Sequence, residues 1–150
     1  SCGSWPLDQY LRAQAGQDAR KHVAAPFVLC EGEGNTVLGY YTLSGISVDI
    51  GAWPENVVKK LPRYPVLPAT LLGRLAIDRQ LQGKGAGEYL LMDALHRSLQ
   101  AAHQVAALAV IVDAKDARAV AFYRYYEFTP FEDQPARLFL PMGVIEKLFP

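Results

Sequence analysis

Three glycines at alternate positions separate a segment with the pattern of a strand from a segment with the pattern of a helix. Apolar and mixed side chains alternate through ATLLGRLAID, residues 69–78. Gly83, Gly85 and Gly87 follow, and an apolar stripe at helical spacing comes next, made of Leu91, Leu95, Ser98, Leu99 and Ala102. A strand that passes directly into a helix is the building unit of α/β folds, so the sequence predicts this class.

The glycines also predict an anion site. Residues without a side chain let a ligand approach the backbone, and glycine adopts positive φ without strain. Backbone N–H groups and the positive end of the following helix dipole would then face a phosphate. Two nucleotide motifs do not fit, because GxGxxG would need glycine in place of Glu88, and GxxxxGK followed by Ser or Thr is broken by Gly85. The alternative is an ordinary glycine-rich turn.

The first half of the chain reads as helices followed by a strand pair. Helical spacing over residues 7–22 predicts one or two short helices. Residues 26–32 and 35–50 are rich in β-branched and aromatic side chains, and they predict an antiparallel pair joined by a turn at Glu31 to Asn35. Four prolines between Gly51 and Pro68 predict a long loop. Loops of this length often carry function.

The second half continues the alternation of strands and helices. Residues 105–114, VAALAVIVDA, are apolar nearly throughout and predict a strand that is buried on both faces. Residues 116–128 return to helical spacing and place Ala119, Phe122, Tyr123 and Tyr126 on one side. Two short strands are expected near Thr129 to Glu132 and Arg137 to Leu140.

Composition limits the classes of partner and metal site. A length of 150 residues with 51% hydrophobic residues predicts a single domain over residues 1–150. The 15 basic and 15 acidic residues cancel, so a nucleic acid would have to meet a local patch. Cys2 and Cys30 lie far apart in sequence, and we expect neither a disulfide nor a metal site. No apolar run reaches the roughly 20 residues of a membrane span, so we expect a cytoplasmic protein.

The segment Gln82 to Gly87 has the pattern QxxGxG, which resembles the pyrophosphate loop of the Gcn5-related N-acetyltransferases, the GNAT superfamily. The resemblance implies acetyl-CoA as cosubstrate, with Gln82, Gly83, Lys84, Gly85, Ala86 and Gly87 around the pyrophosphate. It also implies that Leu75, Ala76 and Ile77 pair with the pantetheine arm. The implied fold is a central, mixed and strongly twisted sheet of about six strands with helices on both faces.

The segment DARAVAFYRYYEF, residues 116–128, is similar to the second signature of that superfamily. Asp116 takes the place of an asparagine, and Glu127 replaces the usual glycine. The resemblance implies that Asp116 and Phe122 contact the cofactor and that Tyr123 is the general acid. The alternatives are a helix N-cap for Asp116 and a packed core aromatic for Tyr123.

Nearly the whole chain also resembles the acetyltransferase toxins of type II toxin-antitoxin modules, the TacT-like and AtaT-like branch. The matching blocks are SCGSWPLDQYLR, LGYYTL, LLGRLAIDRQLQGKGAGEYLLMDAL and VDAKDARAVAFYRYYEF. This resemblance implies acetylation of the α-amine of aminoacyl-tRNA, a ribbon-helix-helix antitoxin and a homodimer. The block that precedes CG in these toxins is lacking, so we expect an N-terminal strand to be absent from this chain.

Four basic residues near the glycines are candidates for contacts with tRNA phosphates: Arg74, Arg79, Lys84 and Arg97. Acidic neighbours are interleaved with them, and a solvated mixed surface is the alternative. No histidine or glutamate stands out as a general base, which an α-amine with a pKa near 7.7–8.0 tolerates. Two other functions stay open: acetylation of a small amine or a protein N-terminus, and a non-catalytic module that binds CoA or a partner.

Overall fold

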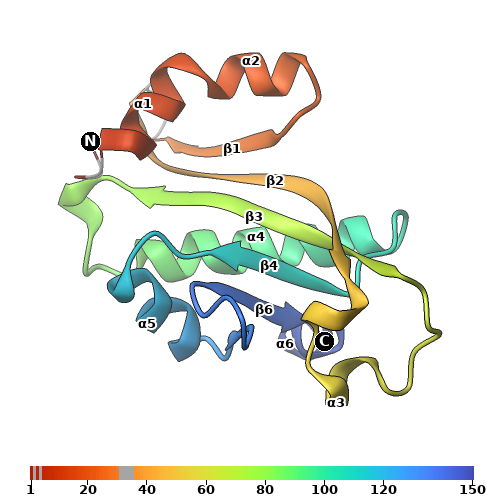
Figure 1. The fold of residues 1–150 in the computed structure, drawn as a ribbon. Coiled ribbons are helices and arrows are strands. Elements are labelled where there is room, and N and C mark those ends of the chain that lie inside the picture. Colours follow the sequence, from red (N-terminus) through yellow and green to blue (C-terminus); the bar gives the residue numbers. More distant parts are fainter. Residues whose placement is uncertain (2, 4, 31–35) are drawn as a thin grey trace. The chain divides into compact units, whose positions relative to one another are not determined.

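The structure is a computed structural model that describes residues 1, 3, 5–30 and 36–150. Within these residues, six strands form a mixed sheet in the order β1-β2-β3-β4-β6-β5, and helices flank the sheet (Figure 1). The α/β class predicted from the sequence is therefore confirmed. Two compact units make up the chain, residues 1–44 with 72–97 and residues 45–71 with 98–150.

The elements are distributed along the whole described chain. The helices are α1 (Trp5–Ala13), α2 (Ala15–Arg20), α3 (Glu55–Val58), α4 (Ala86–Ala102), α5 (Ala117–Tyr125) and α6 (Met142–Leu148), with 3-10 turns η1 (Ile50–Ala52) and η2 (Arg79–Leu81). The strands are β1 (Ala25–Cys30), β2 (Val37–Asp49), β3 (Val66–Ile77), β4 (Ala109–Asp113), β5 (Thr129–Pro130) and β6 (Arg137–Pro141).

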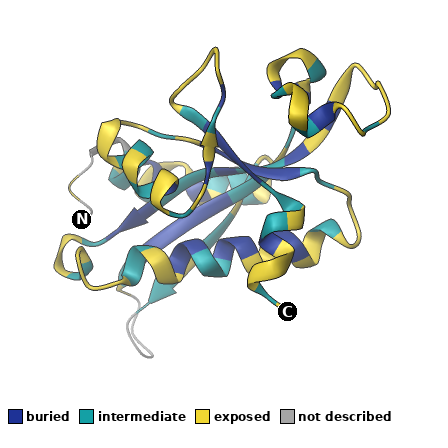
Figure 2. Ribbon diagram, turned by 90° about the horizontal axis from the view of Figure 1, so that it is seen from below, coloured by how far each residue is buried: buried dark blue, intermediate teal, exposed yellow. Residues whose placement is uncertain are grey.

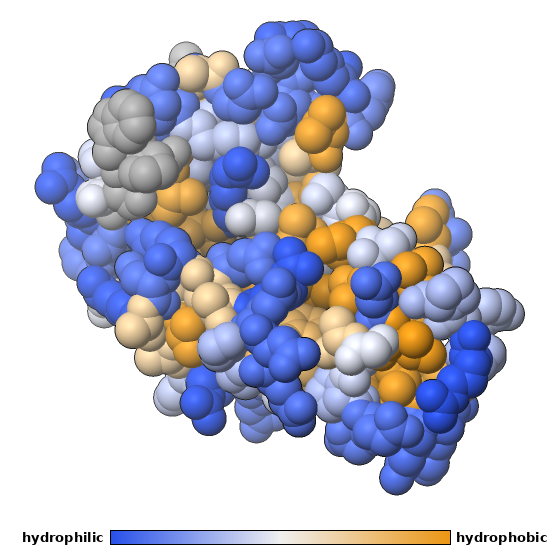
Figure 3. Space-filling view, viewed as in Figure 1, coloured by the Kyte–Doolittle hydropathy of each residue, from blue (hydrophilic) through white to orange (hydrophobic). Residues whose placement is uncertain are grey.

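In the first unit, α1 and α2 confirm the two short helices that the sequence predicts. The apolar side of α1 packs Tyr10 against Tyr40 of β2, with ring centroids 6.2 Å apart, and the Tyr40 hydroxyl donates to the Leu7 carbonyl at 2.7 Å. The surface over α2 is mostly hydrophilic (Figure 3). Ala15 of α2 and Ala76 of β3 join the two tyrosines in one buried cluster, so both helices contact it through one apolar side.

Strands β1 and β2 form the predicted antiparallel pair, with Phe27 opposite Tyr41 and their rings stacked at 5.1 Å. The predicted turn at Glu31 to Asn35 lies outside the described residues. The Tyr41 hydroxyl donates to the Asp93 carboxylate at 2.6 Å and accepts from Arg97 Nε at 3.0 Å. This phenol therefore connects β2 to two side chains of α4, and it is covered by the Arg97 guanidinium over the Phe27 ring.

Replacing Tyr41 by Phe is expected to lower the unfolding free energy by about 1–2 kcal/mol at pH 8, because Asp93 and Arg97 lose their shared partner. Burial, followed by the hydrogen bond to Asp93, raises the pKa of Tyr41 to about 12. The folded value exceeds the unfolded value near 10, so the stabilisation is complete below pH 10 and is lost as pH rises towards 12. Urea unfolding at pH 8, 10 and 11 should show that the difference in unfolding free energy between the wild type and Tyr41→Phe becomes smaller as pH rises. A difference that stays constant contradicts this account.

Helix α4 carries the apolar stripe that the sequence predicts. Leu91, Leu95 and Ser98 have no exposed surface and Leu99 is buried, whereas Glu88, Arg97 and Gln100 are exposed. Figure 2 shows the alternation of buried and exposed positions along this helix. The stripe confirms the helical reading of the segment that follows the glycines.

In the second unit, the core forms around three aromatic rings. Trp53 lies 5.3 Å from Phe131 and 5.4 Å from Phe139, in edge-to-face arrangements. Ala109 and Ile111 of β4 join this cluster, and residues 109–112 are all at most 1% exposed, as predicted for a strand covered on both faces. Strand β6 pairs antiparallel with β4 and with β5, which confirms the two short strands expected near the end of the chain.

Two expectations about element boundaries were wrong. The segment from Gly51 to Pro68 is not a continuous loop, because α3 begins at Glu55 and β3 begins at Val66. Pro68 fits within β3 because its carbonyl accepts from the Leu108 N–H at 2.9 Å and its ring is exposed. The strand expected over residues 105–114 begins only at Ala109, since the Val105 N–H still bonds to the Ala101 carbonyl of α4. Helix α6 was not predicted.

Helix α5 ends in a Schellman motif that has glutamate at the position where glycine is favoured. The Phe128 N–H donates to the Tyr123 carbonyl at 3.1 Å, and the Glu127 N–H donates to the Arg124 carbonyl at 3.0 Å. Glu127 has φ +71°, and the Phe128 ring packs against Tyr123 at 5.3 Å. The left-handed residue explains why the related signature has glycine here, and Glu127 carries backbone strain in its place.

Replacing Glu127 by Gly is expected to raise the unfolding free energy by about 0.5–1 kcal/mol, because relief of the left-handed strain exceeds the entropy cost of glycine. Glu127→Gln is the matched control, since it removes the charge and keeps the strain. Thermal or urea unfolding of both variants makes the comparison. Equal stability of the two variants contradicts the strain at φ +71° as the cause.

Candidate functional site

The end of β3 is held against β2 by a close backbone approach. The Asp78 N–H donates to the Leu38 carbonyl at 2.7 Å. A Cβ atom added to Gly39 would lie 2.9 Å from the Ala76 carbonyl oxygen and 2.9 Å from side-chain atoms of Ile77 and Leu90. Glycine is therefore required at position 39, and the carboxyl end of β3 has a fixed position within the first unit.

The turn after β3 is fixed by two side chains. Asp78 caps η2, because its carboxylate accepts from the Gln80 N–H at 2.9 Å. This hydrogen bond, together with the Ser1 amino group at 3.0 Å, lowers the pKa of Asp78. Gln82 Nε2 donates back to the Ile77 carbonyl at 3.1 Å. The first residue of the QxxGxG pattern thus ties the loop to the strand that precedes it.

Gly83 and Gly85 supply the left-handed backbone that the glycine loop needs. Their φ angles are +80° and +81°, and a Cβ atom at either position would meet no other atom within 4 Å. Backbone conformation therefore requires glycine here, and open space lies in front of both residues. Gly87 has a different role, because it lies in the first turn of α4.

The loop ends at the amino terminus of a long helix. The Tyr89 N–H donates to the Gly85 carbonyl at 3.1 Å, which is the first helical bond of α4. Helix geometry leaves the N–H groups of Ala86, Gly87 and Glu88 without helical acceptors. These groups, the helix dipole and the exposed Lys84 all favour an anion. The chemistry of this loop fits a diphosphate, the group that the sequence pattern implies.

The remaining predicted cofactor residues of the first unit lie directly before this loop. Leu75, Ala76 and Ile77 are the last three residues of β3, and Ala76 and Ile77 are buried. The structure therefore joins this strand end and the Gln82–Gly87 loop in one continuous segment of the first unit.

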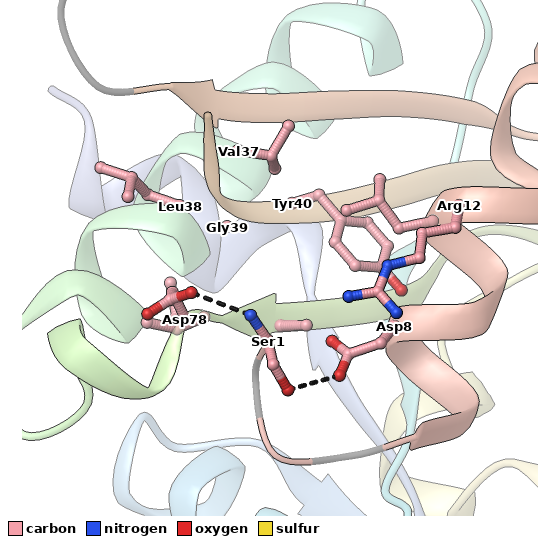
Figure 4. Close-up of a pocket in the computed structure, with 11 residues that line it drawn as sticks. Ser1, Asp8, Arg12, Val37, Leu38, Gly39, Tyr40 and Asp78 are labelled. Carbon is pink, nitrogen blue, oxygen red and sulfur yellow. Dashed lines mark hydrogen bonds and ion pairs between the residues drawn. The ribbon is translucent and has the colours of Figure 1, made fainter. Parts of the chain in front are cut away.

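A pocket of about 190 Å³ lies beside the same strand end (Figure 4). Its lining comes from α1, from the start of β2 and from Ala76 to Asp78. Asp8 and Asp78 place two carboxylates at it, and the Ser1 hydroxyl and amino group contact them at 2.7 and 3.0 Å. Sequence reasoning missed the part taken by Asp8 and Arg12, because only folding brings α1 to this strand end.

In the second unit, Tyr123 is a packed aromatic residue, as one of its two readings proposed. Its ring lies 5.2 Å from Phe122 and 5.3 Å from Phe128, and 7% of the residue is exposed. Burial raises the pKa of Tyr123 well above its usual value, so the hydroxyl stays protonated at neutral pH. Tyr125 on the same helix is 79% exposed. Packing and proton donation are compatible, because packing fixes the ring and leaves the phenol protonated.

Asp116 is the N-cap of α5, since its carboxylate accepts from the Ala119 N–H at 2.8 Å. The structural reading of this residue is thus confirmed. Its assigned contact with a cofactor, and that of the half-buried Phe122, stay predictions.

The four basic candidates for RNA contacts separate into two pairs. The Arg74 guanidinium lies 3.5 Å from the centroid of the Tyr10 ring, and Arg97 is engaged with Tyr41 and Phe27. Both arginines have packing roles within the first unit. Arg79 and Lys84 are exposed, one in η2 and one in the glycine loop. The structure therefore favours the second pair for contacts with a ligand.

Two negative findings apply to the described residues alone. Among them, no three His, Cys, Asp or Glu side chains form a group that could hold a metal ion. No described helix has both the length and the apolar character that crossing a membrane requires.

The mixed sheet, the left-handed glycine loop and the helix after it are the features that the resemblance to GNAT acetyltransferases implies. A sequence profile described as the Acetyltransferase (GNAT) domain matches residues 68–142. A "tRNA-acetylating toxin" of Mycobacterium tuberculosis (strain ATCC 25618 / H37Rv) is 38% identical over 142 residues, which cover 95% of this chain and 83% of the relative. The chain belongs to the GNAT acetyltransferase family.

Two solved structures of a toxin are similar over the whole chain. AtaT complexed with acetyl-methionyl-tRNAfMet has a TM-score of 0.92 and 34% identity, covering 100% of this chain and 89% of that one. A tyrosine-to-phenylalanine mutant of AtaT, bound to the C-terminus of the antitoxin AtaR and acetyl-CoA, has a TM-score of 0.84 and 31% identity, with coverage of 99% and 86%. The resemblance to acetyltransferase toxins is confirmed as a similarity of sequence and fold.

Proposed function

We propose that this chain is an acetyl-CoA-dependent toxin that acetylates the α-amine of aminoacyl-tRNA and thereby blocks translation. The observation that carries the acyl-donor assignment is the loop itself, with Gly83 and Gly85 in left-handed conformation before the amino terminus of α4. The acceptor assignment is supported by the tRNA-acetylating relative and by AtaT, which both match nearly the whole chain.

Different residues bind different chemical groups of the cosubstrate. The N–H groups of Gly83, Gly85, Ala86 and Gly87 and the Lys84 ammonium bind the diphosphate of acetyl-CoA, whereas the Lys84 N–H donates to the Leu81 carbonyl. Leu75, Ala76 and Ile77 offer backbone groups to the amides of the pantetheine arm, in the way that a strand accepts a neighbour. The resemblance assigns Asp116 and Phe122 to the same cosubstrate, and that assignment stays a prediction. Open space in front of both left-handed glycines supports this assignment for the diphosphate.

Acetyl transfer forms one bond and breaks one. The neutral amine nitrogen attacks the thioester carbonyl carbon, and a backbone N–H group at the end of β3, other than the paired N–H of Asp78, stabilises the oxyanion. The C–S bond then breaks, and the CoA thiolate takes the proton of the Tyr123 hydroxyl. The amine proton passes to water, and Tyr123 regains its proton from solvent. Burial raises the pKa of Tyr123, which keeps the phenol protonated before the transfer and also makes it a weaker acid.

An α-amine acceptor agrees with the sequence, in which no histidine or glutamate stands out as a general base. An α-amine with a pKa near 7.7–8.0 has a useful neutral fraction at pH 7.5, whereas a lysine ε-amine near 10.4 has almost none. Charged tRNA is a cytoplasmic substrate, so the proposal places the toxin in the cytoplasm. A ribbon-helix-helix antitoxin, homodimer formation and a single domain over residues 1–150 stay predictions.

The test uses labelled acetyl-CoA with four acceptors: aminoacyl-tRNA, the same tRNA without its amino acid, a peptide with a free N-terminus and a polyamine. Label on aminoacyl-tRNA alone supports the proposal. Label on the peptide or polyamine alone would identify an acetyltransferase with a different acceptor and overturn the tRNA assignment. Binding of acetyl-CoA without transfer to any acceptor would indicate a non-catalytic module.

A further inference from the structure

The segment between η1 and β3 concentrates positive charge on a chain whose net charge is zero. Residues 50–68 contain three basic side chains, Lys59, Lys60 and Arg63, and one acidic side chain, Glu55. All three basic residues are exposed. Tyr64 follows them and is 62% exposed. We name residues 59–64 the basic-aromatic loop.

The basic-aromatic loop is fixed to the second unit at both ends. Val58, directly before it, is 2% exposed in the cluster that contains Trp53, and the half-buried Leu61 packs against the same cluster. The Ile50 N–H donates to the Pro65 carbonyl at 3.0 Å, directly after the loop. Because apolar residues of this segment occupy the core, its charged side chains are left on the solvent side.

The polar groups of the loop are only weakly engaged with the protein. Arg63 contacts Glu55 at 3.6 Å, and both side chains are at least 70% exposed. An ion pair of this kind contributes little to stability, so Arg63 can turn to another anion at small cost. The Tyr64 N–H donates to the Pro62 carbonyl at 2.9 Å, and prolines at 62 and 65 restrict the backbone around the ring. The ring is therefore presented to solvent by a restricted backbone.

We propose that the basic-aromatic loop is an RNA-binding surface. Lys59, Lys60 and Arg63 pair with phosphates, and an unpaired base stacks on the Tyr64 ring. Basic side chains interleaved with an exposed aromatic ring are the combination that binds single-stranded nucleic acid. Six residues extend over at most about 20 Å, which matches a few consecutive nucleotides. The inference rests on the proposed function, since it assigns the tRNA a contact that the glycine-loop candidates do not provide.

The first test changes charge. The triple variant Lys59→Ala, Lys60→Ala and Arg63→Ala is compared with a control that also loses three exposed positive charges, Lys21→Ala, Arg124→Ala and Lys147→Ala. Affinity for aminoacyl-tRNA is measured from about 50 to 200 mM salt. The slope of log Kd against log salt should be smaller by about 2 in the triple variant, because each of the three lost phosphate contacts contributes about 0.7 to the slope. The control should keep the wild-type slope.

The second test changes the aromatic ring. Tyr64→Ala should weaken tRNA binding by about tenfold, whereas Tyr64→Phe, which keeps the stacking surface, should bind as the wild type does. Thermal unfolding and acetyl-CoA binding of all variants should be unchanged, because none of these side chains is buried.

The outcomes separate this inference from the proposed function. A wild type that binds and acetylates aminoacyl-tRNA, together with loop variants that match the control, would overturn the loop assignment and keep the acceptor. A wild type that neither binds nor acetylates tRNA would overturn both. The triple variant is also tested for its affinity to fully duplex RNA. If it loses the same affinity for duplex RNA as for tRNA, and Tyr64→Ala has no effect, the stacking contact is rejected.

Discussion

Replacing Tyr123 by Phe is expected to slow acetyl transfer by about 10²–10⁴-fold at saturating acetyl-CoA and acceptor, the contribution typical of a positioned general acid. The change removes one hydroxyl and keeps the ring that packs against Phe122 and Phe128. Fold and acetyl-CoA affinity should therefore stay near those of the wild type. A relative with a tyrosine-to-phenylalanine change has been crystallised with acetyl-CoA, so a change of this type is compatible with cosubstrate binding in that protein.

The matched control is Tyr125→Phe, which removes an exposed hydroxyl from the same helix and should leave the rate unchanged. The pH profile gives a second readout. Because burial raises the pKa of Tyr123, the phenol stays protonated and the wild-type rate should not fall before about pH 10. Below pH 10, the rate should rise only once, near pH 8, where the acceptor amine loses its proton. Equal rates for the two variants would remove Tyr123 from the mechanism.

Replacing both loop glycines, Gly83→Ala with Gly85→Ala, is expected to weaken acetyl-CoA binding by about 10- to 100-fold. Each residue has φ near +80°, where an L side chain costs about 1–2 kcal/mol. A loop that relaxes from this strain turns its N–H groups away from the diphosphate, and about 1.4 kcal/mol corresponds to each tenfold loss of affinity. Calorimetric titration with CoA measures the effect.

Gly45→Ala is a suitable control for the loop variant. Gly45 lies in β2, and an added Cβ atom there meets no other atom within 4 Å, as at the loop glycines. The difference between the positions is the backbone conformation. Equal CoA affinity of the control and of the loop variant would show that left-handed backbone at positions 83 and 85 is not needed for the diphosphate.

The sequence predicts those parts of the fold that depend on local pattern. The apolar stripe of α4 and the continuous apolar run of β4 each report burial of one element. The burial of β3 does not follow its alternation, because Leu72 and Ala76 of the mixed face are buried and Leu75 of the apolar face is half-buried. Boundaries were less predictable. Pro68 favours a loop in the sequence, yet it lies within β3, because a strand tolerates proline at a position where the missing N–H is not required.

The candidate site also has parts that the sequence predicts and parts that it does not. A contiguous motif such as Gln82 to Gly87 is visible in the sequence, and its left-handed glycines confirm the reading of a bare backbone. The engagement of Arg74 with Tyr10 and of Arg97 with Tyr41 could not be read from spacing, because both contacts join residues more than 50 positions apart. The sequence predicts ligand contacts for both arginines because they lie near the glycine motif. In the structure both of them pack against aromatic side chains of the fold.

The close approach at Gly39 has a use in searching for homologues. Any side chain there would collide with the end of β3, so sequences that keep this spacing between β2 and β3 should have glycine at the equivalent position. A glycine about 40 residues before the QxxGxG motif is therefore a criterion for selecting homologous sequences by their fold, whatever their substrate. It can separate chains with this strand geometry from those that share only the glycine-rich motif.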